Sequence, residues 1–350
     1  MKEDKEILMW SIRPWELFEK TNKKQEGEFN TTHNYEQFQK QIDNWNSEIE
    51  FVDLQTYISK SKGKVTNSET VDLRISSGVN QGLFDPSIFG ESRKQCLQCK
   101  KLLTKIEKCS FCQHHEILFY TQKDYLGYIK LSTPVVHPWF FGTISTFLGN
   151  LEKLRQLLYY QIYLVPQSGD FRFDLEHSIS FSEYVDSKNS TAISGAHAIK
   201  KLLQNLSIEK IGNDPILIEK YQLYQKYFGY LISDVLPVIP TRFRPVKYIF
   251  RDNSCGEQDA GGINGLYRRV INRNKRLNRL NELQAPKIII INEERMLQEA
   301  VDDLFANTKN RTYRLSRGNR KMESFVDVLP PLHKLSNDIG AIFIESKDSF

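Results

Sequence analysis

The sequence has little of the features that mark several common protein classes. No stretch of it approaches the run of about 18 apolar residues that a membrane-spanning helix needs. Charge of one sign is not in large excess, since 48 Lys and Arg stand against 43 Asp and Glu. Apolar residues are 40% of the 350 residues and charged residues 26%. This balance favours about two folded domains over a disordered or collagen-like chain.

Signals for export are also missing from the first residues of the sequence. The segment MKEDKEILMWSIRPW contains acids among its bases and no apolar core of a signal peptide. A typical transit peptide is rich in Arg and Ser and poor in acids, so the segment does not fit that class either. We therefore expect a chain that is made in the compartment where it works and that has no membrane partner.

Cysteine is scarce outside one cluster. Four of the five cysteines form the pattern Cys96-x2-Cys99-x9-Cys109-x2-Cys112, and Cys255 stands alone. Two Cys-x-x-Cys turns that face each other offer four thiolates at the corners of a tetrahedron, which is a ligand set that Zn²⁺ takes in structural sites. The alternative interpretation is a set of four free, buried thiols.

Two histidines, His114 and His115, follow the cluster closely. We do not expect either of them to be a ligand, because four cysteines already complete a tetrahedral shell. Such a closed shell leaves no position for water. The sequence therefore predicts one structural Zn²⁺ and not a catalytic one.

Two stretches near the carboxyl end have apolar residues at three-, four- and seven-residue steps, as in a coiled-coil seam. They predict helices near 262–283 and 292–306 that pair as an antiparallel hairpin. Arg273 and Asn274 interrupt the first seam. The seam residues are Ile263, Leu266, Val270, Leu277 and Leu280 on the first helix, and Met296, Leu297, Ala300, Val301 and Leu304 on the second.

Polar residues mark the start of the second helix and surround the hairpin. Asn292 is placed to cap that helix, with Glu293 and Glu294 in its first turn, where the helix dipole favours anions. From Arg242 to Arg320 there are 17 Lys and Arg against 9 Asp and Glu. Such a block predicts a nucleic-acid backbone or a partner protein, although a solvated helical face is the alternative.

A second basic stretch, KNRTYRLSRGNRK (309–321), follows the hairpin. It holds four Arg and two Lys, and a flexible basic loop is the alternative to a nucleic-acid contact. The spacing of the basic residues alone does not choose between these interpretations.

Motifs of common active sites are absent from the sequence. Nucleotidyl transfer needs metal ions held by clustered carboxylates, and there is no Asp-x-Asp-x-x-Asp pattern. Asp302 and Asp303 are adjacent on a predicted helix, so they point about 100° apart and do not chelate one ion together. A Walker loop, Gly-x-Ser-x-Gly and His-Glu-x-x-His are also missing. His137 lies in an apolar run and is expected to be a core residue, so we expect no catalytic activity from the chain by itself.

Several stretches in one order resemble the β′ subunit of multisubunit DNA-directed RNA polymerase, in the shorter form, called gamma or β′, of cyanobacteria and plastids. The resemblance covers about residues 8–328. Its most specific part, GLYRRVINRNKRLNRLNELQAPKIIIINEERMLQEAVDDLF (265–305), is similar to the clamp helices of that family. The other matching stretches are GLFDPSIFG (82–90), the cysteine cluster, GYIKLSTPVVHPWF (127–140), SGAHAIKKLL (194–203), LPVIPTRFRPV (236–246) and RGNRKMESFVDV (317–328).

The resemblance implies a fold and a division of the chain. We expect an α+β fold, mostly helical, that forms the clamp head of β′ with a small zinc-binding module and an antiparallel clamp-helix coiled coil. The expected segments are an N-terminal clamp segment with a polar insertion (1–80), the zinc-binding module (81–116), the clamp core (117–247), a lid-like loop (248–262), the clamp-helix hairpin (263–306), a rudder-like basic segment (307–328) and a divergent tail (329–350).

The resemblance also implies partners. The hairpin is expected to dock a sigma factor through Arg273, Glu293 and Ala300. The rudder-like segment is expected to contact DNA and the RNA–DNA hybrid. The other implied partners are the alpha and beta subunits of the polymerase and the remaining pieces of β′. The residues expected to contact nucleic acid are Arg311, Arg314, Arg317 and Arg320.

The sequence departs from the family pattern in four places. The first cysteine pair is Cys-x2-Cys where many members have Cys-x-Cys, residues 21–80 are longer and more polar, and the lid region carries the insertion RDNSCGEQ. The match ends after Val328, before the Asn-Ala-Asp-Phe-Asp-Gly-Asp loop that holds catalytic Mg²⁺ in the family.

We therefore expect a non-catalytic portion of a split β′ subunit, which belongs to a nucleotidyltransferase whose Mg²⁺ lies on a partner chain. The expected location is the plastid, in the chloroplast stroma, rather than the bacterial cytoplasm. One alternative is a free-standing zinc protein that binds sigma or nucleic acid without joining a polymerase. Another is a decayed fragment, against which the intact cysteines and the intact hairpin argue.

Overall fold

A computed structural model describes residues 54–121, 123, 125–138, 141–166, 173–187, 191–206, 218, 231–251, 254–259, 262–307, 314–315 and 321–328. The chain divides into two compact units, each built from segments that are far apart in the sequence. Unit 1 comprises Met1–Ile129, Pro237–Arg268 and Leu304–Phe350, and unit 2 comprises Lys130–Leu236 and Arg269–Asp303.

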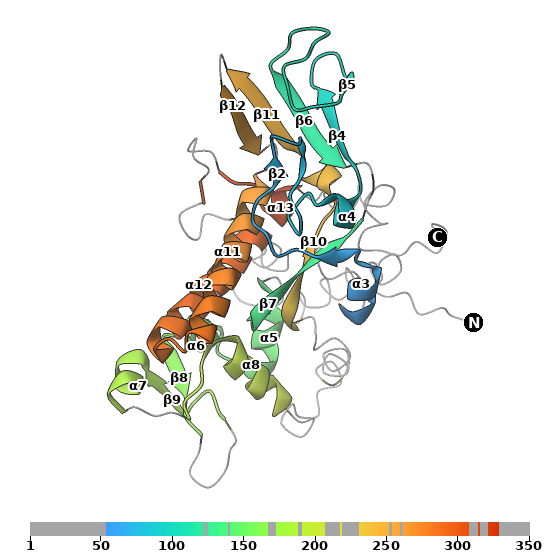
Figure 1. Ribbon diagram of the computed structural model, residues 1–350. Coiled ribbons are helices and arrows are strands. Elements are labelled where there is room, and N and C mark those ends of the chain that lie inside the picture. The colour runs from blue at the N-terminus through green and yellow to red at the C-terminus, as the bar shows by residue number, and fades with distance from the viewer. Residues whose placement is uncertain are drawn as a thin grey trace, which may run out of the picture. The chain divides into compact units, whose positions relative to one another are not determined.

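Unit 1 contains a five-stranded antiparallel sheet (Figure 1). Buried and half-buried side chains alternate along its central strand, as the period of two of a strand requires. The buried ring of Phe119 lies 5.5 Å from that of Phe84 and 6.3 Å from that of Tyr248, edge to face. In sheet order the strands are β12 (Ser254–Asp259), β11 (Val246–Arg251), β6 (Glu116–Thr121), β4 (Ser92–Cys96) and β5 (Leu102–Leu103).

Short elements surround this sheet in unit 1. Asp85 caps α4 by accepting a hydrogen bond from the Ser87 N–H, and Pro86 occupies the first turn, where no N–H is needed. The beginning of β7 (Gly127–Val136) pairs in parallel with β1. The short elements are α3 (Leu54–Lys60), β1 (Gly63–Lys64), β2 (Val71–Asp72), β3 (Ser77–Gly78), α4 (Pro86–Phe89), the 3-10 helix η2 (Thr241–Phe243) and α13 (Phe325–Val328).

A fully buried arginine, Arg244, lies in the core of unit 1. Its guanidinium carbon is 4.7 Å from the ring centre of Phe89 and 5.7 Å from that of Tyr267. Its Nε donates to the Ile239 carbonyl at 2.7 Å, and one terminal nitrogen donates to the Asn264 side chain at 3.1 Å. Hydrogen bonds and aromatic faces thus compensate the burial of this charge.

Unit 2 packs α6 against α8, with leucine and isoleucine side chains between them. The Ser194 hydroxyl donates to the carbonyls of Leu157 and Ile162 just before α8 begins. Gly195 has φ of +69°, and a Cβ there would lie 2.2 Å from the Tyr160 hydroxyl, so only glycine fits. The elements are α5 (Phe141–Leu148), α6 (Leu151–Leu158), β8 (Ile162–Leu164), β9 (Ser178–Ser180), α7 (Phe181–Ser187), α8 (Gly195–Gln204) and β10 (Ile232–Val238).

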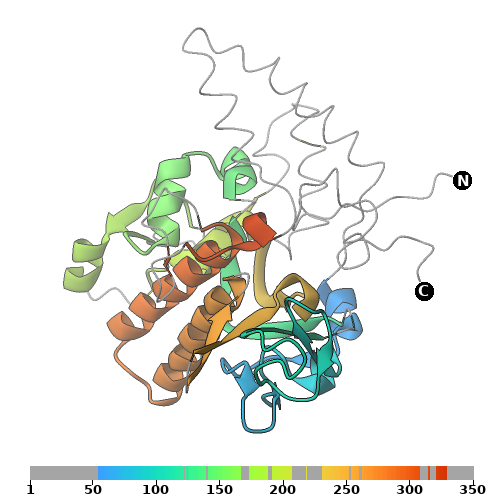
Figure 2. The ribbon, with the colours of Figure 1, turned by 90° about the horizontal axis from the view of Figure 1, so that it is seen from above.

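The two longest described helices are α11 (Ile263–Glu282) and α12 (Lys287–Phe305). They lie side by side in both views (Figures 1 and 2). The predicted antiparallel hairpin is therefore present. None of the described helices is both long enough and apolar enough to span a membrane.

Several expectations need correction. The expectation of a mostly helical fold is not confirmed, because four sheets accompany the helices. The stretch 248–262, expected as a loop, contributes β11 and β12, which form a hairpin against β6. Apolar residues between Ile218 and Leu231 recur at helical spacing and predict a helix over 214–234, but β10 begins at Ile232, before the predicted end. The rest of that helix, most of the segment 1–80 and the tail 329–350 lie largely outside the described residues.

Candidate functional site

The four clustered cysteines meet at one point in unit 1. Cys96 Sγ is 3.5 Å from Cys112 Sγ, and Cys99 Sγ is 3.6 Å from Cys109 Sγ. All four sulfurs lie within 4.8 Å of one another, and the cluster is the one group of three or more potential metal ligands among the described residues. Tetrahedral Zn²⁺ with Zn–S bonds of about 2.3 Å places its sulfurs about 3.8 Å apart. The residues therefore fit a Zn²⁺ ion.

The two cysteine pairs form the same turn. The Lys100 N–H donates to the Cys96 carbonyl at 3.1 Å, and the Gln113 N–H donates to the Cys109 carbonyl at 2.9 Å. Lys100 and Gln113 both have positive φ, +59° and +58°. The Cys-x2-Cys spacing of the first pair thus produces a turn equivalent to that of the second pair.

Backbone donors favour a thiolate at one of the ligands. The N–H groups of Cys112 and Phe111 point at the Cys109 sulfur and lower the pKa of its thiol to about 6. The His114 N–H acts on Cys112 in the same direction, but burial and the neighbouring sulfurs raise the pKa of Cys112 to about 12. Four thiolates so close together need a cation to neutralise them, and the site has the electrostatics of a metal centre.

Neither neighbouring histidine belongs to this sulfur cluster. His114 Nε2 lies 3.7 Å from a Glu116 carboxylate oxygen, and the His115 carbonyl accepts from the Phe250 N–H at 2.9 Å. Lys247 Nζ is 2.9 Å from the same carboxylate and holds the pKa of Glu116 below its ordinary value. The histidines therefore connect the second knuckle to β11.

A second group of functional candidates lies on the hairpin within unit 2. Glu293 is nearly fully buried, with 2% of its side chain exposed, and its carboxylate forms ion pairs with two arginines of α11. Arg273 is 3.0 Å and Arg276 is 3.2 Å from its carboxylate oxygens. Asp303, ten residues further along α12, lies 3.9 Å from Arg269. These ion pairs join the two helices where the seam is not apolar.

The structure corrects the predicted start of the second helix. That helix begins at Lys287, directly after Pro286, and includes the isoleucines at 288–291. Asn292 is therefore not its N-cap, and its side chain accepts from Arg295 at 2.9 Å. Glu294 accepts from the Tyr160 hydroxyl at 2.8 Å. Both acids predicted to face a helix dipole make side-chain contacts instead.

The three residues expected to contact sigma have very different exposure. Arg273 has 26% of its side chain exposed, and it points across the hairpin to Glu293 and not simply outward. Ala300 is fully buried in unit 2. Of the three, Arg273 alone combines a charged group with a partly exposed side chain, and Glu293 and Ala300 are buried.

Two amide side chains that sequence reasoning missed bind the backbone of β7 within unit 2. Asn274 Oδ1 accepts from the Ser132 N–H at 2.8 Å, and Asn274 Nδ2 donates to the Lys130 carbonyl at 2.9 Å. Gln298 both accepts from the Val136 N–H and donates to the Val136 carbonyl, each at 2.8 Å. A polar residue that interrupts an apolar seam, as Asn274 does, is the feature of the sequence that could have indicated such a buried hydrogen bond.

The adjacent aspartates of α12 have separate partners, as their helical spacing predicts. Asp302 accepts from the Tyr159 hydroxyl at 2.7 Å and from Gln298 at 2.9 Å. Asp303 lies near Arg269. The buried His137 has its pKa lowered to about 3 by desolvation, which suits a neutral core residue.

The rudder-like segment is described only in part. The Arg314 N–H donates to Asn307 Oδ1 at 2.9 Å, and the Arg314 carbonyl accepts from the Met322 N–H at 2.9 Å. The Arg314 backbone is thus anchored in unit 1 while its side chain is half-buried. The other three predicted contacts, Arg311, Arg317 and Arg320, lie outside the described residues.

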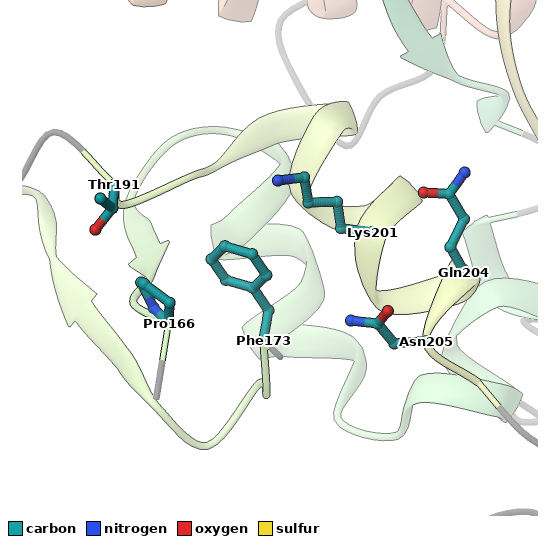
Figure 3. Close-up of a pocket in the computed structure, with 6 residues that line it drawn as sticks. All are labelled: Pro166, Phe173, Thr191, Lys201, Gln204 and Asn205. Carbon is teal, nitrogen blue, oxygen red and sulfur yellow. The ribbon is translucent and has the colours of Figure 1, made fainter. Parts of the chain in front are cut away.

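A cavity of about 440 Å³ opens beside the carboxyl end of α8 in unit 2 (Figure 3). Lys201 extends across it, with its Nζ 4.9 Å from the ring centre of Phe173. None of the residues predicted from sequence lines it. The lining residues are Pro166, Phe173, Thr191, Lys201, Gln204 and Asn205.

Comparison with known proteins gives consistent results. The family RNA polymerase Rpb1, domain 1, matches residues 46–228 and 208–330. The DNA-directed RNA polymerase subunit beta′ of Borrelia turicatae is 33% identical over an alignment of 303 residues, and the match covers 77% of this chain and 22% of that protein. The subunit of Treponema denticola is 33% identical over 301 residues, covering 77% of this chain and 21% of that protein. The chain spans about a fifth of the length of the curated relatives it matches.

Proposed function

The chain belongs to the RNA polymerase Rpb1, domain 1 family, and we propose that it supplies the non-catalytic N-terminal portion of the β′ subunit of a DNA-directed RNA polymerase. The observation that carries this proposal is the continuous family match through the hairpin, together with the ion-paired construction of α11 and α12. In this proposal the catalytic Mg²⁺ lies on the partner chain that carries the rest of β′. DNA and the other polymerase subunits, alpha and beta, are the partners.

The cysteine module has a structural role in this proposal. Cys96, Cys99, Cys109 and Cys112 would hold one Zn²⁺, which would cross-link the two knuckles when bound. The backbone N–H groups that point at the Cys109 sulfur stabilise its thiolate, the form that a metal requires. Four protein ligands leave no open coordination position, so the module takes no part in bond making.

The hairpin is proposed as the sigma-docking surface. Arg276 has 64% of its side chain exposed although it pairs with Glu293, and Arg273 is exposed in part. Their guanidinium groups retain N–H donors for an acidic partner. Glu293 positions both arginines from inside the hairpin, and Ala300 allows close approach of the helices. Arg314 and the neighbouring basic residues are proposed to contact the RNA–DNA hybrid.

Co-purification tests the central proposal. The full chain, tagged and expressed in its source organism, is expected to recover the alpha and beta polymerase subunits and the rest of β′ in equal amounts. Recovery of a sigma factor or nucleic acid without any polymerase subunit would instead support the free-standing zinc protein.

The plastid or cyanobacterial type of the subunit, with a location in the chloroplast stroma, is part of the same proposal. The relatives compared above are bacterial, so the finer assignment rests on the resemblance of the clamp-helix sequence. Locating the gene in a plastid genome would support it. A locus in any bacterial chromosome would overturn the stromal location, and one outside the cyanobacteria would overturn the type as well.

A further inference from the structure

A basic surface on unit 1 lies outside every site that the sequence predicted. It consists of Lys62, Lys64, Lys123 and Tyr125, named here the lysine–tyrosine patch, and all four residues are exposed. Within the part of the chain that the structure describes, no carboxylate forms an ion pair with these lysines. We propose that this patch binds single-stranded nucleic acid, with the lysines on successive phosphates and a base stacked on Tyr125.

Strand β1 sets two of the lysines in a row. Lys62 and Lys64 are two residues apart in an extended segment, so their side chains point to the same side, with Cα atoms about 6.6 Å apart. Gly63 and Val65 face the interior: Val65 is 1% exposed, and a Cβ on Gly63 would lie 2.9 Å from an Ile88 side-chain carbon. Parallel pairing with β7 fixes this orientation. The row therefore presents two cations at a spacing comparable with that of successive phosphates.

Lys123 and Tyr125 continue the row. Lys62 Nζ lies 5.3 Å from the centre of the Tyr125 ring, and the Lys62 N–H donates to the Leu126 carbonyl at 2.9 Å. A Cβ on Gly90 would lie 3.1 Å from the Lys123 Cγ and 3.8 Å from the Tyr125 Cδ2, so these two side chains adjoin over Gly90. One aromatic ring is thus placed between cations from two separate segments.

This arrangement fits a single strand better than a duplex. Sites for single strands combine a track of cations with aromatic rings on which unpaired bases stack, and stacking tolerates any base. Tyr125 is 37% exposed, which leaves ring surface for such a base. A duplex has no unpaired base to offer, and an anionic membrane surface would engage the lysines without a defined role for the ring. The inference does not depend on assembly into a polymerase, because all four side chains belong to this chain.

The test uses the full chain and a fluorescent oligothymidylate of about 12 nucleotides, within the range of known single-strand site sizes. Fluorescence anisotropy is measured at several salt concentrations. The triple variant Lys62→Gln, Lys64→Gln, Lys123→Gln is expected to bind more weakly, and its slope of log affinity against log salt should be smaller by about 2, the value for three lost phosphate contacts. Tyr125→Leu is expected to weaken binding about tenfold with an unchanged salt slope, because stacking releases no counterions.

A matched control has the same change of charge in unit 2. The triple variant Lys153→Gln, Lys200→Gln, Lys201→Gln should keep the salt slope of the parent. Binding through the basic stretch 309–321 is present in every variant, so the difference between the two triples reports the patch. Equal loss in both triples would overturn the proposal. The proposal would also be overturned if Tyr125→Leu bound the single strand as tightly as the parent and the parent bound a duplex equally well. A patch triple variant that lost binding to phosphatidylserine vesicles but kept its oligonucleotide binding would overturn it too.

Discussion

The cysteine module and the helical hairpin depend on very different parts of the chain. All four sulfur ligands come from the single stretch 96–112. The hairpin is held to β7 in unit 2 by Asn274 and Gln298, whose partners are 142 and 162 residues away. A ligand set encoded by local spacing is therefore visible in a sequence, whereas side-chain amides that satisfy a distant strand are not.

The difference also concerns what kind of interaction holds each region together. The module places four thiols within 4.8 Å of one another, an arrangement that a metal stabilises. The hairpin contains its own counter-charge, because the buried Glu293 forms ion pairs with two arginines. Removal of metal should therefore loosen the module and leave the hairpin intact, and hairpin substitutions should leave bound zinc unchanged.

The largest effect is expected from Cys96→Ser. It removes one of four ligands, and structural zinc contributes about 10–16 kcal/mol in small zinc-binding domains. The variant should lose its zinc, measured as metal per chain by mass spectrometry, and residues 90–116 should exchange amide hydrogens faster. Cys255→Ser is the control, since it lies outside the cluster and should retain one zinc per chain. Equal zinc content in both variants would contradict the site.

The next effect is expected from Glu293→Gln. The neutral amide leaves Arg273 and Arg276 without their counter-charge, at a cost of about 2–3 kcal/mol. This lies below the cost of a fully buried broken pair because both arginines keep access to water. Urea unfolding measures the loss. The control is Glu176→Gln, which breaks an exposed pair with Lys153 and should cost less than about 1 kcal/mol.

Arg273 on the hairpin is the proposed contact for a sigma factor. Arg273→Ala is expected to weaken binding of the cognate sigma factor by about 2 kcal/mol, the scale of a hydrogen bond to a charged group. Arg314→Ala, in the rudder-like segment, should leave sigma affinity unchanged and weaken nucleic-acid binding in a salt-dependent way. Titration calorimetry with purified sigma measures both. If the two variants behave in the opposite way, the docking surface is not on the hairpin.

A smaller effect is expected from Gln298→Leu. The substitution leaves the N–H and carbonyl of Val136 without the partners they now have, at a cost of about 1.5 kcal/mol. Asn272→Leu, at an exposed position of α11, should change stability by less than about 0.5 kcal/mol. Urea unfolding measures the stability of the two variants, and hydrogen exchange of β7 should be faster in Gln298→Leu than in Asn272→Leu. Faster exchange confined to the cysteine module would be the contradictory result.

The smallest effect is expected from pH. The pKa of the Cys109 thiol is lowered in the folded chain to about 6, below its ordinary value of 9. Its thiolate therefore stabilises the folded chain fully above pH 9, and this stabilisation is lost as the pH falls through 6. Protons then compete with the metal for this ligand. Zinc retention during dialysis should fall as the pH is lowered through 6. The helical far-ultraviolet circular dichroism of the chain, to which the hairpin contributes, should stay constant. Retention that is flat from pH 8 to 5 would argue against a thiolate site.

Part of the fold could be predicted because its determinants are local. The spacing of the cysteines and the seam residues of α11 each lie within about 20 consecutive positions, and both appear as predicted. The predicted start of α12, residue 292, is five residues too late. Proline is common at the start of a helix, so Pro286 can directly precede the first turn, and the isoleucines that follow it belong to the helix.

The sequence by itself determined the cluster of four cysteines and the existence of the hairpin, since period and spacing are properties of neighbouring residues. Tertiary structure alone decided that β6 pairs with β11, that Glu293 is buried beneath two arginines and that Lys62 and Lys123 flank Tyr125. These contacts join residues that are between 17 and about 130 positions apart. They form because a buried strand edge or carboxylate must find a partner, wherever in the chain that partner lies.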